Sequence, residues 1–189
     1  GKIPKQYRWR PLKVEQLKNI RIIRTFMPPL ESKGVARRIM LIGSFAFSSL
    51  FALPLVGKID VIWATSWLPG LIYGKVKRKP VALNVDDLTV EDLSDLKLVS
   101  KNSIILKIAA LVYRIFYVKG DAVTPISPGY VETISQKYCV EKSKIHVVRG
   151  GVDLTVFKPN ASQEKTSKKF TVLYSGAFSI GYDFEQILK

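Results

Sequence analysis

The sequence predicts an α/β fold built around a parallel sheet, and two observations lead to this prediction. Short runs rich in Val, Ile and aromatic residues alternate with longer runs of helical periodicity, which is typical of βαβ units with right-handed crossovers. The chain has 189 residues, of which 47% are hydrophobic and 24% charged. These values suffice for one domain with a core and exclude a disordered or collagen-like chain.

The expected strands are short runs bounded by Gly, Pro, Lys or Asp. They are Ile20–Arg24, Asp60–Ala64, Val81–Val85, Ala122–Ile126, Ile145–Val148 and Phe170–Tyr174. The expected helices cover residues 35–52, 68–77, 90–98, 103–118 and 129–138, and a last one begins near Tyr182. We expect Pro54 to end the first helix near Leu53, because proline cannot continue a helix.

The polar segment 158–169, KPNASQEKTSKK, contains no large apolar residue and lies between two strand-like regions. Such a composition cannot supply a core, so we predict an interdomain linker there. Residues 1–157 then form one domain. Residues 170–189 are too few for a domain and read as the start of a second one.

The charge of the chain is strongly positive. Thirty Lys and Arg residues against fifteen acidic residues leave a net charge of +15, which indicates an anionic partner: nucleic acid, an acidic membrane surface or a phosphorylated ligand. A single cysteine, Cys139, and a single histidine, His146, exclude a disulfide scaffold and a zinc finger and disfavour a metal centre of His and Cys. His146 lies in an apolar strand-like run, where we expect a packed residue rather than a catalytic one.

Two apolar helical segments leave a membrane role open. Residues 39–57 carry no charge and approach the length of a bilayer span, but a helix buried against the sheet explains them better. Residues 101–119 place Lys107 and Arg114 on one face and contain no acidic residue. This pattern fits a basic amphipathic helix on an anionic membrane, and equally a helix that covers the sheet and has a solvated basic edge.

Two carboxylates follow the expected strand Val81–Val85, at Asp86 and Asp87. The carboxyl ends of parallel strands are where α/β proteins bind ligands, and paired carboxylates there can hold a hydroxyl, a metal ion or a proton. The acids in 91–95 have a local explanation, as the first turn of a helix capped by Thr89. We therefore predict a functional role for Asp86 and Asp87.

Gly176 and Gly181 follow the expected strand Phe170–Tyr174 and precede a helix. Glycine in such a turn lets the backbone approach a phosphate, and the helix N-terminus adds N–H donors. A strand–turn–helix junction also uses glycine on steric grounds alone. The chain has neither a Walker A motif nor a complete G-x-G-x-x-G motif.

Several of these pieces, in this order, resemble the retaining glycosyltransferases of family 4, whose GT-B fold has two Rossmann-like domains facing a cleft. The segment 121–159 is similar to the family pattern of a strand ending in serine, a helix, and a second strand leading to Asn-Gly-Val-Asp and Phe-x-Pro. Gly151-Val152-Asp153 and Phe157-Lys158-Pro159 match this pattern, and Gly150 stands where Asn is usual.

Two further segments carry the resemblance. Residues 170–181 are similar to the first strand and glycine loop of the donor domain, and residues 59–93 resemble the branch that builds lipid-linked surface polysaccharides. In that branch's Arg-Asp-Leu-Trp-Pro-Glu region, Asp87-Leu88 and Glu91 fit, whereas Asp86 replaces the basic residue.

The resemblance implies an α/β fold of a GT-B N-terminal domain, with helices on both faces of a Rossmann-like sheet but without its first strand, followed by the beginning of a donor domain. It implies transfer of a sugar, with retention, from a nucleotide-diphosphate donor to a lipid-linked or polysaccharide acceptor. No obligatory metal or other cofactor is implied. The expected location is cytoplasmic, peripheral at the anionic membrane face. Because the donor domain's sugar-nucleotide motifs are missing, this chain alone is expected to be inactive.

The resemblance also implies roles for individual residues. Asp87 and Asp86 would contact the acceptor or the sugar hydroxyls as catalytic residues, and Ser66 and Ser127 would line the cleft. The interdomain hinge would be formed by Gly150, Gly151 and Asp153. The donor diphosphate would bind at Gly176.

Two alternatives remain open at this point. A basic nucleic-acid-binding module would need aromatic residues interleaved with bases, and only Tyr7-Arg8-Trp9-Arg10 offers this pattern, so nucleic acid is not the expected partner. A non-catalytic membrane-surface protein is the other alternative, and the same basic and apolar helices would serve it.

Overall fold

The computed structural model describes residues 11–28, 35–65, 67–96, 99–100, 102–158 and 172–176. Its strands are β1 (Leu12–Leu17), β2 (Ile20–Thr25), β3 (Ile62–Ala64), β4 (Val81–Val85) and β5 (Ala122–Pro125). Its helices are α1 (Val35–Leu50), α2 (Trp67–Lys77), α3 (Thr89–Asp95), α4 (Ile104–Lys119) and α5 (Gly129–Tyr138), with 3-10 turns η2 (Leu53–Leu55) and η3 (Lys142–Lys144). The expected α/β class is confirmed, and the expected elements between residues 20 and 138 are found within a few residues of their predicted limits.

A parallel three-stranded sheet of order β3-β4-β5 forms the centre of the domain. The predicted strand 145–148 runs along the free side of β5 but pairs as an isolated parallel bridge, between Ile145 and Val123. Two backbone hydrogen bonds extend it: His146 N–H donates to the carbonyl of Val123 and Val148 N–H to that of Pro125, both at 2.9 Å. The His146 side chain is exposed, which corrects the expectation of a packed histidine.

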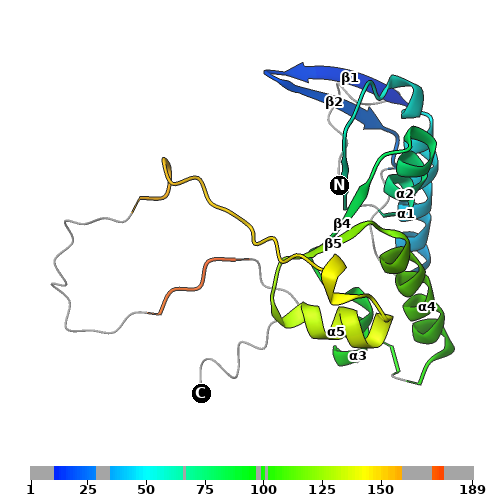
Figure 1. The fold of residues 1–189 in the computed structure, drawn as a ribbon, viewed down its shortest axis with the longest axis vertical. Coiled ribbons are helices and arrows are strands. Elements are labelled where there is room, and N and C mark those ends of the chain that lie inside the picture. Colours follow the sequence, from blue (N-terminus) through cyan, green and yellow to red (C-terminus); the bar gives the residue numbers. More distant parts are fainter. Residues whose placement is uncertain are drawn as a thin grey trace, which may run out of the picture.

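The helices lie together along one side of this sheet (Figure 1). Successive strands are neighbours, and right-handed crossovers between neighbours bring every connecting helix to the same face. Helices α2, α4 and α5 pack on that face around a common core: Ala64, Val81, Leu83, Val85, Leu88, Tyr117, Val123, Ile134, Tyr138, Val140 and Ile145. The described residues place no helix on the opposite face, where Trp63 is 59% exposed, so the predicted cover on both faces is found on one.

Helix α2 packs closely against the sheet because two of its glycines face it. A Cβ on Gly70 would lie 2.4 Å from the Cβ of Ala64, and one on Gly74 would lie 2.2 Å from Cγ2 of Val81. Both distances are far below van der Waals contact, so only glycine fits at these two positions. The spacing of four residues puts both on the same side of the helix.

Strands β1 and β2 form an antiparallel hairpin apart from the parallel sheet. The strand expected at residues 20–24 is therefore confirmed, but its partner β1 was not predicted. Glu15 in β1 accepts hydrogen bonds from Lys13 Nζ at 2.6 Å and from Arg24 Nε of β2 at 2.5 Å. These two bonds lower the pKa of Glu15 to about 2, so its carboxylate links the two strands in its charged form.

Several predictions at the ends of elements need correction. Helix α3 begins at Thr89 with Leu88 in the N-cap position and no side-chain cap, so Thr89 does not cap it. In the predicted strand 170–174, the described residues 172–174 have no regular structure. The rest of that strand, the last predicted helix and the linker residues 159–169 lie outside the described residues. Within the described part of the chain, no helix combines the length and apolar character needed to cross a bilayer.

An aromatic cluster joins α2, α4 and α5 inside the core. Trp67, Tyr113, Tyr117 and Tyr138 meet with ring centroids 4.9–6.1 Å apart, mostly edge to face, a geometry that aromatic quadrupoles favour. The Tyr138 hydroxyl donates to the Glu91 carboxylate of α3 at 2.9 Å, and burial together with that carboxylate raises the pKa of Tyr138. The Tyr117 hydroxyl is buried and has no hydrogen-bond partner among the described residues.

The two buried tyrosines are expected to respond differently to loss of the hydroxyl. Tyr138→Phe should lower the free energy of unfolding by about 2 kcal/mol, because it removes a hydrogen bond to a charged group. Tyr117→Phe should leave that free energy unchanged or raise it, because it removes a buried polar group without a partner. Urea unfolding of both variants measures the difference, and equal losses would contradict the assigned roles.

Candidate functional site

The carboxyl ends of β4 and β5 bring two loops together at one edge of the sheet. Val85 and Pro125 are register partners at the ends of the two strands, and Ile126 N–H donates to the Val85 carbonyl at 3.2 Å. The chain that follows each strand therefore leaves the sheet side by side with the other. We call this region, residues 84–87 and 126–130, the carboxyl edge.

Asp86 lies at this edge and is held there by its own strand. Its Oδ1 accepts a hydrogen bond from Asn84 Nδ2 at 2.8 Å, and Asn84 is only 5% exposed. Trp67 Nε1 in turn donates to the Asn84 backbone carbonyl at 2.8 Å. Asn84 was not predicted as a site residue, although it is the one polar residue inside the otherwise apolar strand VALNV.

Asp87 is exposed at the same edge and acts electrostatically on two neighbours. Burial raises the pKa of Asp92 in α3, and the negative charge of Asp87 raises it further. Burial and then the charge of Asp87 likewise raise the pKa of Tyr130 in α5. The loop after β4 and the helices α3 and α5 therefore bring the carboxylate of Asp87, the carboxyl group of Asp92 and the phenol of Tyr130 close together. Tyr130 and Asp92 were not predicted as site residues.

Ser127 lies on the other loop of the carboxyl edge and is half-buried. Its Oγ accepts a hydrogen bond from the backbone N–H of Gly129, at the start of α5, at 3.3 Å. The hydroxyl hydrogen therefore remains available for an acceptor atom in the loop region. The structure brings Ser127 to the same edge as Asp86 and Asp87, whereas Ser66 lies outside the described residues.

Glu91, which matches the family motif, faces α5 instead of solvent. Its carboxylate accepts hydrogen bonds from the Tyr138 hydroxyl and from Lys137 Nζ, the latter at 2.7 Å. The side chain is 19% exposed. Glu91 therefore joins α3 to α5 and fixes the helix that follows Asp86 and Asp87.

The predicted hinge residues leave the sheet at the same end as the carboxyl edge, because the segment 145–148 that precedes them runs parallel to β5 and Val148 N–H donates to the Pro125 carbonyl. Gly150, Gly151 and Asp153 are exposed in the segment that leaves the sheet, and a Cβ on either glycine would meet nothing within 4 Å. Asp153 Oδ1 accepts from the Thr155 N–H at 2.8 Å and hydroxyl at 2.7 Å, which lowers the pKa of Asp153. Gly176 belongs to the segment 172–176, which Figure 1 shows set apart from the sheet.

The carboxyl edge supplies the hydrogen-bonding groups that suit a polyhydroxyl ligand. Asp86 and Asp87 accept hydrogen bonds, while the Ser127 and Tyr130 hydroxyls can both donate and accept. In the described ranges, His, Cys, Asp and Glu side chains form no group of three or more that is arranged to hold a metal ion. No protein-family model matches the sequence, and no curated protein matches it.

Proposed function

We propose that this chain is the acceptor-side domain of a retaining glycosyltransferase of the GT-B type and that the carboxyl edge binds sugar hydroxyls. The observation that carries the proposal is the placement of Asp86 and Asp87 at the carboxyl end of β4, beside the Ser127 loop at the end of β5. Open α/β sheets bind their ligands outside the carboxyl ends of the strands. Carboxylates accept strong hydrogen bonds from hydroxyl groups.

The charge at this edge favours a neutral ligand over a phosphate. Asp86, Asp87 and Asp92 all lie in or next to the two loops, in a chain whose net charge is +15. A phosphate group would be repelled by these carboxylates. The sugar hydroxyls of an acceptor would therefore occupy the carboxyl edge, and any phosphate of the acceptor would lie toward the basic helices.

The outer surface of α4 supports an acceptor held in a membrane. Its exposed residues are largely aliphatic and flank Lys107 and Arg114: Ile104, Ile105, Ile108, Leu111, Val112, Ile115 and Val118. This composition is typical of helices that lie on an anionic membrane surface. As a crossover helix between parallel strands, α4 begins near the carboxyl edge, so a membrane along α4 would place lipid-linked sugars close to Asp87.

A transfer assay tests the proposal on the protein that the complete gene encodes. Radiolabelled nucleotide sugars are incubated with the protein and with polyprenyl-phosphate glycolipids extracted from its host membrane. We expect label to appear in the organic phase, with the anomeric configuration of the donor preserved in the product. Label found solely as free sugar, or a product of inverted configuration, would overturn the proposed transfer with retention.

A further inference from the structure

A hollow lies at the opposite end of the parallel strands from the carboxyl edge. It has a volume of about 790 Å³ and runs between α2 and α4, at the residues that precede β4 and β5. This volume is in the range of small-molecule binding sites, roughly 300–1,000 Å³. We call this hollow the α2–α4 groove.

The walls of the α2–α4 groove are mainly aliphatic. Leu68, Leu71 and Ile72 of α2 face Ile115 and Phe116 of α4 across it. Leu68 is 46% exposed and Ile115 is 43% exposed, so an apolar ligand here would displace water from these side chains, which is favourable. The apolar surface continues along α4 into a smaller hollow of about 330 Å³ that shares Ile115 and also contains Leu111 and Val118.

Cations surround the mouth of the α2–α4 groove. Its lining includes Lys75, Arg78, Lys79 and Lys119, and one acid, Asp121, whose Oδ2 already accepts a hydrogen bond from the Val81 N–H at 2.8 Å. Among the described residues, Lys79 lies 4.0 Å from the carboxylate of Asp60, while no ion pair engages the other three cations.

The backbone conformation at the end of α2 fixes the positions of Arg78 and Lys79. Arg78 adopts a left-handed conformation with φ of 52°, and Lys79 N–H donates to the Gly74 carbonyl at 3.0 Å. The helix therefore ends there with two consecutive bases at the groove. The partial negative charge at the C-terminus of a helix favours cations there. This preference does not explain why exposed aliphatic side chains line the groove between α2 and α4.

We propose that the α2–α4 groove binds one anionic phospholipid molecule, with its acyl chain between α2 and α4 and its phosphate among Lys75, Arg78 and Lys119. The unpaired cations complement a phosphodiester, and the aliphatic walls complement a hydrocarbon chain. Inorganic phosphate would leave these walls unused. Nucleic acid is disfavoured because recognition of bases uses several aromatic platforms, whereas Phe116 is the one aromatic residue in the lining.

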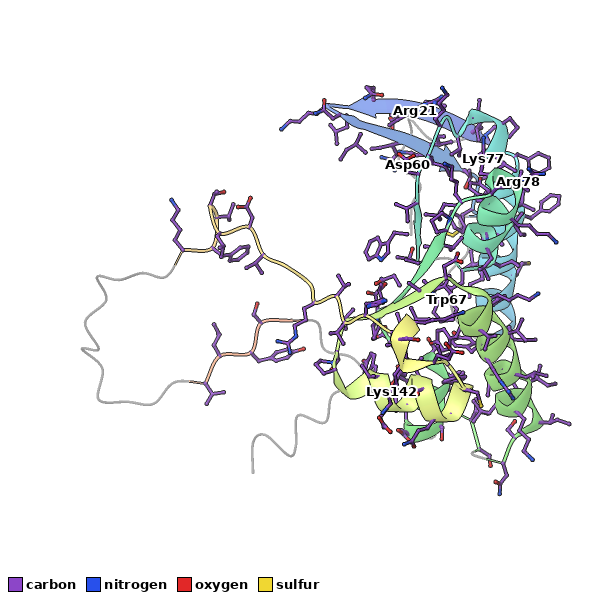
Figure 2. The ribbon with its side chains drawn as sticks, in the orientation of Figure 1. Arg21, Asp60, Trp67, Lys77, Arg78 and Lys142 are labelled. Atoms are coloured by element: carbon purple, nitrogen blue, oxygen red, sulfur yellow. The ribbon has the colours of Figure 1, made fainter. Side chains whose placement is uncertain are left out.

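The phospholipid site is independent of the proposed sugar transfer, since it lies at the other end of the sheet. Figure 2 shows Lys77 and Arg78 at one end of the layer of helices and Lys142 at the opposite end. Lys144 belongs to the same 3-10 turn as Lys142, and Arg149 follows shortly after it. Lys144 and Arg149 flank the segment 145–148 on the free side of β5, and neither lines the α2–α4 groove, so they provide a matched change of charge.

Binding of dihexanoyl phosphatidylglycerol below its micelle concentration tests the proposal by calorimetry on the full-length protein. We expect saturable binding of one lipid per chain. The double variant Lys75→Glu/Lys119→Glu should weaken binding at least about tenfold, whereas Lys144→Glu/Arg149→Glu should leave it nearly unchanged. Ile115→Ser should weaken binding of the lipid while leaving any binding of inorganic phosphate unaffected. Circular dichroism verifies that each variant is folded.

Several outcomes would overturn the phospholipid site. Equal weakening by the two double variants would show attraction to the net charge alone. Inorganic phosphate binding as tightly as the lipid would show that the apolar walls contribute nothing. Binding of a single-stranded oligonucleotide that the lipid cannot displace, or no saturable binding of the lipid at all, would also contradict the proposal.

Discussion

Replacement of Asp87 by Asn is expected to lower the rate of sugar transfer about 100-fold in the protein encoded by the complete gene. Asparagine keeps the size of the side chain but loses the charge that strengthens a hydrogen bond to a sugar hydroxyl. Loss of one contact that stabilises a transition state commonly costs a factor of about 10²–10³ in turnover. Single-turnover incorporation of label into the lipid product measures the effect. The melting temperature should not fall, because Asp87 is exposed.

Asp60→Asn is the matched control for this variant. Asp60 is also exposed, but it precedes β3 and therefore lies at the amino ends of the strands, far from the carboxyl edge (Figure 2). Its replacement should leave the rate of transfer unchanged. Equal rates for Asp87→Asn and the unmodified protein would exclude a catalytic role of Asp87.

Replacement of Gly74 by Ala is expected to lower the free energy of unfolding by about 2 kcal/mol. The added Cβ would meet Cγ2 of the buried Val81 at 2.2 Å, so either α2 or β4 must move, and forced shifts in a packed core cost roughly 1–3 kcal/mol. Gly43 of α1 offers the opposite case, because its Cβ would meet nothing within 4 Å. Gly43→Ala should raise stability by about 0.5–1 kcal/mol through helix propensity.

Urea unfolding of the single variants and of Gly74→Ala in a Val81→Ala background measures these changes. In that background the contact with Cγ2 of Val81 is gone and the Lys79 carbonyl oxygen, at 3.0 Å, is the close contact that remains. The cost of alanine at position 74 should therefore fall to about 1 kcal/mol, since contacting residues are energetically coupled. The same cost in both backgrounds would show that the contact between α2 and β4 does not set the requirement for glycine.

The positions of the central strands could be predicted because their boundaries are chemically sharp. Strand β4 is a run of apolar residues between Pro80 and Asp86, and its predicted limits are those observed. Strand β1 was missed because its hairpin uses Lys18 in a left-handed conformation, with φ of 51°, and not the Asn-Gly or Asp-Gly pair that marks such turns. The one-sided helix layer was also missed, because it depends on strand order, which local patterns do not encode.

Part of the candidate site could also be predicted, because the end of strand β4 is well defined in the sequence. A residue that follows a parallel strand must lie at the carboxyl edge, so Asp86 and Asp87 could be placed from their position after β4. The proximity of Tyr130 to Asp87 could not be predicted, because it depends on how α5 packs beside α3. The α2–α4 groove depends on how closely α2 approaches the sheet, which Gly70 and Gly74 permit but their sequence spacing alone does not specify.

All residues of the core cluster come from one continuous stretch of chain, between Ala64 and Ile145. Since each strand of the parallel sheet pairs with the next one in sequence, the contacts that stabilise this stretch close comparatively short loops. Such a stretch behaves as one cooperative foldon, in which amide hydrogens exchange through a common opening. The β1–β2 hairpin is a separate sheet, and the Phe26 carbonyl after β2 accepts a hydrogen bond from the Ser48 hydroxyl of α1. The hairpin can therefore open and close without unfolding the sheet that carries Asp87.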